Sequence, residues 1–342
     1  WKQRTKRILQ RLLLFLSIMG PGLITASADN DASGIATYSM AGSFYGYTFL
    51  WTLVWVTFGE VVTQEMAARM GAVTGKGLTD LVRERFGVRI AFLLMLGLFL
   101  ANLGTTAAQF AGIAASGELF GLSRYLIVPL AALGVWLLVM RGSYHRVEKV
   151  LLFLTLYAVA YILSAFLVHP PWGEVLRNTI VPTIHFQPRF LLALLATVGT
   201  TMTPWGCAYM KATVAKGITM KEYPYTRLDV VFGAIMGNVV SGFVIICTAA
   251  TLFVYGIHVE TAEQAALSLV PLAGVWAKQL FGAGLFGASL LAASVLPLAT
   301  TYAVCEAFGW ERGIDRTMDD APMFYGLYTF MIVLSAAIVL IP

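Results

Sequence analysis

The chain has 342 residues, of which 58% are hydrophobic and only 12% are charged. A soluble domain carries about twice that charged fraction, so the composition excludes a soluble globular protein and indicates a protein whose solvent is the bilayer. The net charge of +5 is compatible with a nucleic-acid partner, but the positions of the basic residues, given below, argue against one.

Long apolar runs predict nine membrane-spanning helices. Several of these runs are continuously apolar and do not alternate with polar residues, which favours helices over the strands of a transmembrane barrel. The predicted spans cover residues 10–43, 45–70, 88–119, 122–140, 147–168, 188–216, 228–257, 276–308 and 322–341.

The basic residues predict the orientation of these spans. If the N-terminus is cytoplasmic, all but four of the 23 lysines and arginines lie on the cytoplasmic side. The four exceptions are Arg124, Arg177, Arg189 and Lys278. Because positively charged loops stay inside, we expect a multi-pass protein of the cell (inner) membrane with a cytoplasmic N-terminus. The same asymmetry explains the net charge without a nucleic-acid partner.

The first and sixth spans are too long to be single helices, and each is interrupted. In the first, residues 12–28 favour a helix that meets the polar segment 29–34. In the sixth, residues 190–198 favour a helix that meets 199–206, a segment with two glycines and Pro204. Proline and glycine interrupt helices. Breaks at membrane depth are tolerated where the freed backbone is buried or lines a wet cavity.

The two breaks are separated by five helices, so they fall at matching places in two consecutive halves. We expect a first five-helix repeat in residues 1–168 and a second in 188–342, within one transmembrane domain covering 1–342. An odd repeat length makes the halves insert with opposite orientation, which is typical of inverted-repeat transporters with a site at the midplane. Two such repeats need ten spans, and nine are found, so the sequence lacks a tenth.

Three short motifs carry a family resemblance. They are Gly20-Pro21-Gly22, Thr74-Gly75-Lys76-Gly77-Leu78 and Thr203-Pro204. Together with the breaks, they resemble the Nramp family of metal-ion transporters. The resemblance implies an all-α polytopic protein with the LeuT-like fold, an inverted repeat of five-helix units with broken first and sixth helices.

The chain departs from this family at its metal ligands. The family motif Asp-Pro-Gly-Asn is here Asp31-Ala32-Ser33-Gly34, so the asparagine ligand is absent. The family motif Met-Pro-His is here Thr203-Pro204-Trp205, and the second family histidine falls at Met210. The acidic pair of the third span falls at Thr105 and Ala108. These substitutions resemble the Nramp-related magnesium transporters, a divergent branch.

The resemblance implies a metal site with one carboxylate. Its predicted members are Asp31, the backbone carbonyls of Ala28 and Thr200, and the changed positions Gly34 and Thr203. Without the thioether, a soft ligand, the site offers hydroxyl and carbonyl oxygens. Mg²⁺ keeps several waters and binds one or two carboxylates, so we expect a roomy site for Mg²⁺ that also admits Mn²⁺.

Each of these polar residues has a structural alternative. Asp31 can cap the half-helix that restarts at Ala32, and both roles can hold at once. Of Asp29 and Asn30, we expect one to face an aqueous vestibule and the other to stabilise the unwound backbone, with direct ligation the weaker alternative. The Thr203 hydroxyl can bind the ion or cap its own turn.

Polar residues elsewhere in the spans are expected to be structural. Glu60 and Glu65 can form a gate with Arg69, although an i,i+4 pair on one helix is the stronger interpretation. Trp205 is expected to be a packing residue. The residues expected to bridge helices are Asn102, Gln109 and Asn238. The acids expected to be solvated at span ends are Glu118 and Glu306.

The sequence therefore predicts a secondary transporter that carries Mg²⁺, and also Mn²⁺, without proton coupling. The alternatives are a proton-coupled Mn²⁺ or Fe²⁺ importer and, more remotely, a Na⁺-coupled amino-acid transporter of the same fold. No catalytic constellation is found, so we expect no enzyme. The metal ion is expected as substrate, with no cofactor, and the protein as a monomer in the lipid bilayer.

Overall fold

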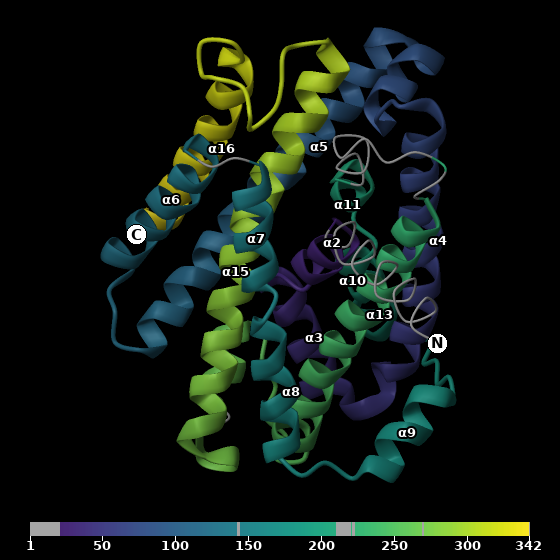
Figure 1. The fold of residues 1–342 in the computed structure, drawn as a ribbon. Helices are drawn as coiled ribbons and strands as arrows, with labels where there is room; N and C mark the ends of the chain where they lie inside the picture. The colour runs from purple at the N-terminus through teal and green to yellow at the C-terminus, as the bar shows by residue number, and fades with distance from the viewer. Residues whose placement is uncertain (1–20, 142–143, 210–219, 221–222, 269, 342) are drawn as a thin grey trace, which may run out of the picture.

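The computed structural model describes residues 21–141, 144–209, 220, 223–268 and 270–341. Every regular element in these ranges is helical (Figure 1). The helices are α2 (Pro21–Asp29), α3 (Ala32–Tyr45), η1 (Gly46–Phe49), α4 (Leu50–Thr74), α5 (Leu78–Leu119), α6 (Arg124–Met140), α7 (Tyr144–Leu154), α8 (Tyr157–Leu167), α9 (Trp172–Ile180), α10 (Pro188–Thr201), α11 (Pro204–Tyr209), α13 (Tyr223–Thr248), η2 (Ala249–Phe253), α14 (Ala262–Ser268), α15 (Val270–Phe308) and α16 (Pro322–Leu340). The start of the predicted first span and Met210 lie outside the described residues.

Six of the nine predicted spans overlap helices that can cross a membrane. Within the described part of the chain, six are long and apolar enough to cross a membrane: Leu78–Leu119, Lys149–Leu167, Pro188–Cys207, Tyr223–Phe253, Lys278–Phe308 and Pro322–Leu340. Helix α6 is also apolar but has only 17 residues. Glu60, Gln64 and Glu65 lower the hydropathy of α4, which is 25 residues long.

Large apolar side chains cover the outside of the bundle. Trp55, Phe58, Leu93 and Leu195 are each about two-thirds exposed. A soluble monomer rarely exposes so much apolar surface, and a bilayer accommodates it. The outer surface therefore supports the interpretation from composition.

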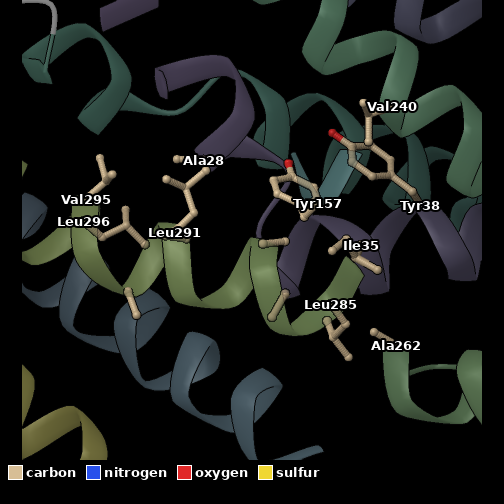
Figure 2. Close-up of a cluster of buried hydrophobic side chains, with 14 of the residues drawn as sticks. Ala28, Ile35, Tyr38, Tyr157, Val240, Ala262, Leu285, Leu291, Val295 and Leu296 are labelled. Atoms are coloured by element: carbon tan, nitrogen blue, oxygen red, sulfur yellow. The ribbon is translucent and has the colours of Figure 1, made fainter. Parts of the chain in front are cut away.

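The first broken helix lies at the centre of the bundle. Helix α13 packs against α2, α3, α4 and α8, and α15 packs against α5 and α8. Figure 2 shows Ala28 and Ile35 of the broken helix among the buried side chains, with Leu285 of α15 nearby. Close approach depends on small residues: a Cβ on Gly237 of α13 would stand 2.7 Å from the Ala26 carbonyl oxygen. This packing buries the break within the bundle.

The expectation that Glu306 is solvated is wrong. It is 1% exposed, and its carboxylate lies directly against Gly77, where a Cβ would have no room. The loop after α15 folds back over the start of α5, so that Arg312 lies 4.0 Å from Glu306 and 3.4 Å from Asp80. A buried charge needs such a partner, and the contact gives a reason for the second glycine of the 74–78 motif.

Candidate metal site

The first helix break is organised around Asp31. Helix α2 ends at Asp29, α3 begins at Ala32, and Asp31 caps α3 in an extended conformation (φ −77°, ψ −176°). Its Oδ1 accepts hydrogen bonds from the Gly34 N–H at 2.8 Å and from the Ser33 hydroxyl at 2.5 Å. The capping role is therefore confirmed. A carboxylate has about four acceptor sites, so capping leaves capacity for an ion.

Helix α5 delivers an amide group to the same carboxylate. Gln109 Nε2 donates to Asp31 Oδ2 at 2.8 Å, and Gln109 Oε1 accepts from the Ala32 N–H at 2.9 Å. The predicted bridging role of Gln109 is confirmed, but its target, the candidate metal ligand, was not foreseen. In a continuous helix the Ala32 N–H would bind the Ala28 carbonyl. Here it binds Gln109, which frees that carbonyl, a predicted ligand, from this helical bond.

The second broken helix reaches the same point through Thr200. A Cβ on Gly34 would stand 3.5 Å from Asp31 Oδ1, 3.5 Å from Thr200 Oγ1 and 2.8 Å from the Asp29 carbonyl oxygen. Oxygens from both broken helices thus lie around the position that a Cβ on Gly34 would take. Of the predicted set, the structure brings together Asp31, Gly34 and Thr200. It places the hydroxyl of Thr200 there, whereas the sequence pointed to its carbonyl.

The second break lies later than predicted. Helix α10 continues to Thr201 and α11 begins at Pro204, so the helix does not end at Val198. The reason is that the hydroxyls of Thr197 and Thr201 bind the carbonyls four residues earlier, at 2.9 Å each, so these polar residues are compatible with a helix. Proline, which lacks an N–H, then begins the next half-helix.

Thr203 in this second break contacts Asp29, not Asp31. Its hydroxyl donates to Asp29 Oδ1 at 2.6 Å. Asn30 has the stabilising role expected of one member of the Asp29–Asn30 pair. It donates to the Gly237 carbonyl at 2.7 Å and accepts from the Ser241 hydroxyl at 2.5 Å. Ligation of an ion by Thr203 stays a prediction.

Helix α4 adds a further buried acid, Glu60, which the sequence predicted only as part of a gate or ion pair with Arg69. Glu60 accepts hydrogen bonds from Gln64 at 2.8 Å and from Asn238 of α13 at 2.7 Å. Arg69 pairs with Glu65 at 3.6 Å, as the i,i+4 interpretation predicted. A carboxylate inside a span is costly and marks a functional site by default. That signal was available in the sequence.

These groups suit an ion that keeps part of its water shell. In the ranges that the structure covers, no three His, Cys, Asp or Glu side chains are arranged to hold a metal. Asp31 instead offers a single carboxylate among hydroxyl, amide and carbonyl oxygens. Mg²⁺ and Mn²⁺ accept such oxygen ligands together with water. Trp205, at the family's histidine position, is buried in the main apolar cluster, as predicted for a packing residue.

A helical membrane protein whose two interrupted helices meet at a buried carboxylate has the architecture of a transporter. Known proteins support this class. The chain belongs to the Nramp family, because the profile described as natural resistance-associated macrophage protein-like matches residues 22–342.

Several relatives have names that describe transport. The divalent metal cation transporter MntH of Erwinia tasmaniensis is 31% identical over 281 residues, which cover 78% of this chain and 66% of that protein. MntH of Bacillus subtilis is 27% identical over 281 residues, which cover 79% and 66%. The chain thus spans about two thirds of the length of these relatives. They are transporters and not enzymes, as predicted, and the metal is their substrate rather than a cofactor.

Solved structures confirm the fold. The manganese transporter of Eremococcus coleocola in complex with an aromatic bis-isothiourea substituted compound has a TM-score of 0.73 and 19% identity, over 94% of this chain and 76% of that one. A mutant of the same transporter has a TM-score of 0.76 over 96% and 70%. The predicted all-α, LeuT-like fold is therefore confirmed. The magnesium branch stays a prediction.

Proposed function

We propose that this protein carries a divalent cation across the membrane by alternating access, with Asp31 as the charged ligand. One observation supports this most directly: a buried carboxylate lies where both broken helices meet, and its side-chain partners are neutral. Relatives named as divalent metal cation transporters and as a manganese transporter support the class of ion.

Within that class we propose Mg²⁺, with Mn²⁺ also accepted. The positions of the family's asparagine and methionine ligands carry Gly34 and Thr203. The site therefore lacks the soft thioether that favours transition metals and holds oxygens that suit a partly hydrated Mg²⁺. We further propose a monomer of two inverted repeats in the cell (inner) membrane with a cytoplasmic N-terminus, on the basis of the charge asymmetry.

We also propose that transport is not coupled to protons. The family's histidine and acidic positions carry Trp205, Met210, Thr105 and Ala108, none of which titrates near neutral pH. The Thr105 hydroxyl is bound to the Ala101 carbonyl at 3.0 Å. The second candidate is a proton-coupled Mn²⁺ importer, which the manganese transporters among the structural relatives favour.

Flux into proteoliposomes tests both candidates. The purified chain is reconstituted, Mg²⁺, Mn²⁺ or Ca²⁺ is added outside, and a pH-sensitive dye inside reports protons. We expect Mg²⁺ and Mn²⁺ entry driven by their gradients and the membrane potential, without acidification, and no entry in vesicles with the Asp31→Ala protein. Acidification that scales with Mn²⁺ entry while the potential is clamped would establish the proton-coupled candidate instead.

A further inference from the structure

A cluster of two acidic residues lies beside the candidate metal site, and the proposed function does not use it. It contains two buried carboxylates, Asp29 of α2 and Glu60 of α4. Asp29 accepts a hydrogen bond from Thr203. Glu60 accepts hydrogen bonds from Gln64 and Asn238. The cluster therefore joins α2 and α4 to α13 and to the second helix break.

Gly206 shows that the two carboxylates belong to one cluster. A Cβ on this residue would stand 3.5 Å from Thr203 Oγ1 and 3.7 Å from Gln64 Nε2. Thr203 is bonded to Asp29 and Gln64 to Glu60, so the two bonded pairs lie on either side of a glycine. The two carboxylates also interact electrostatically. Two buried carboxylates are unfavourable unless a positive charge compensates them.

Three oxygens in the cluster need a partner. Asp29 Oδ2, Gln64 Oε1 and Asn238 Oδ1 are buried and accept no hydrogen bond from the part of the chain that the structure describes. The three side chains are 3–6% exposed. Buried polar atoms are nearly always satisfied, and all three of these atoms can only accept. A group of acceptors next to two carboxylates calls for a positive ligand.

We propose that Asp29 and Glu60 hold a second divalent cation, with the amide oxygens of Gln64 and Asn238 as further ligands. Two carboxylates balance the charge of one divalent ion, and the oxygen donors are those that Mg²⁺ and Mn²⁺ accept. Asp29 is two residues from Asp31, so both sites share the first helix break. The class of ion rests on the proposed function.

Mn²⁺ binding to the purified full chain tests this, with bound ions counted by equilibrium dialysis. Asp31→Ala removes the first site, and we expect this variant to retain one Mn²⁺ per chain. Adding Glu60→Gln, which keeps the side-chain shape, should weaken that ion at least tenfold, since a charged contact is lost. Asp29→Asn in the same Asp31→Ala background should weaken Mn²⁺ binding to a similar extent. It tests the second site independently if the protein with Glu60→Gln does not fold. Glu65→Gln is the matched control and should change affinity less than twofold.

Each other outcome is decisive. If Asp31→Ala binds no Mn²⁺ while wild type binds one ion, the second site does not exist and the proposed function stands. If Asp31→Ala retains an ion whose affinity is the same with and without Glu60→Gln, the cluster does not hold it and the proposal is likewise overturned. If wild type neither binds nor transports Mn²⁺ or Mg²⁺, the proposed function fails and the second site fails with it.

Discussion

The two helix breaks are built differently. At the first, three neighbouring helices hold the chain by hydrogen bonds. Gln109 of α5 accepts from the Ala32 N–H, and Asn30 donates to α13. Tyr157 of α8 donates to the Ser27 carbonyl at 2.6 Å. The unwound segment is thus held by hydrogen bonds from α5, α8 and α13.

At the second break, Met202 and Thr203 lie between the half-helices. They form fewer hydrogen bonds to neighbouring helices in the part of the chain that the structure describes. Thr203 forms one hydrogen bond to another helix, to Asp29. Met202 lies against α4, with its Sδ 3.0 Å from where a Cβ on Gly59 would stand, and methionine adapts easily to its surroundings. From this difference we expect the first break to be the more rigid of the two and the second to adapt more readily.

The largest effect is expected from removing the charge at the first break. Asp31→Ala leaves a neutral site, and one lost charge-assisted contact costs roughly 1.5–3 kcal/mol, or about tenfold to a hundredfold in affinity. Isothermal titration with Mn²⁺ measures it in a Glu60→Gln background, where only the first site titrates. Asp319→Ala, in an exposed loop, is the control. Unchanged affinity in Asp31→Ala would reject Asp31 as the ligand.

A matched pair of alanine substitutions compares the rigidity of the breaks. In Gly34→Ala the new Cβ meets the Asp29 backbone carbonyl at 2.8 Å, and overpacking of this kind costs about 1–3 kcal/mol. In Gly59→Ala the new Cβ meets the flexible end of the Met202 side chain. Replacing a glycine inside a helix stabilises the folded state by up to about 1 kcal/mol, which offsets this contact. Unfolding in mixed SDS micelles measures both free energies. Equal costs would show that the first break yields as readily as the second.

Selectivity can be shifted at the second break. Thr203→Met restores the family's thioether, and a soft ligand should favour Cd²⁺ over Mg²⁺ by roughly tenfold, the effect of about 1.4 kcal/mol. Thr203→Leu is the control because it loses the same hydroxyl without gaining sulfur. Competition between Cd²⁺ and Mg²⁺ for the purified protein gives the ratio. No gain in Thr203→Met relative to Thr203→Leu would mean that position 203 does not contact the ion.

The existence of both breaks could be predicted because local chemistry causes them. Asp31 and Pro204 are helix-starting residues in otherwise apolar spans, and both begin half-helices in the structure. The predicted end of the sixth helix at Val198 is early because Gly199, a residue type that disfavours helices, lies inside α10. The Thr197 and Thr201 hydroxyls donate hydrogen bonds to carbonyls of their own helix. A sequence pattern does not reveal these hydrogen bonds.

The partners across helices could not be predicted. Gln109 and Asp31 are 78 residues apart, and Glu60 and Asn238 are 178 apart. These contacts depend on how each helix is rotated about its axis. In a span that is apolar on both its lipid and its protein faces, periodicity indicates that rotation poorly. Glu306 shows the same limit, since its burial depends on a loop that folds back from later in the chain.

The smallest effect should come from a support of the first break that does not touch the ion. Tyr157→Phe removes one of the two hydrogen bonds that the Ser27 carbonyl accepts, the other coming from the Asn30 N–H at 3.2 Å. The loss of one such bond should cost about 1 kcal/mol. Tyr161, one turn later on α8, is the matched control, because its buried hydroxyl has no hydrogen-bond partner among the described residues. Tyr161→Phe should therefore be neutral or slightly stabilising. Unfolding in mixed SDS micelles compares the two, and Mn²⁺ affinity should be unchanged in both. If Tyr157→Phe costs no more than Tyr161→Phe, α8 does not hold the first break in place, and the difference in rigidity between the breaks rests on α5 and α13 alone.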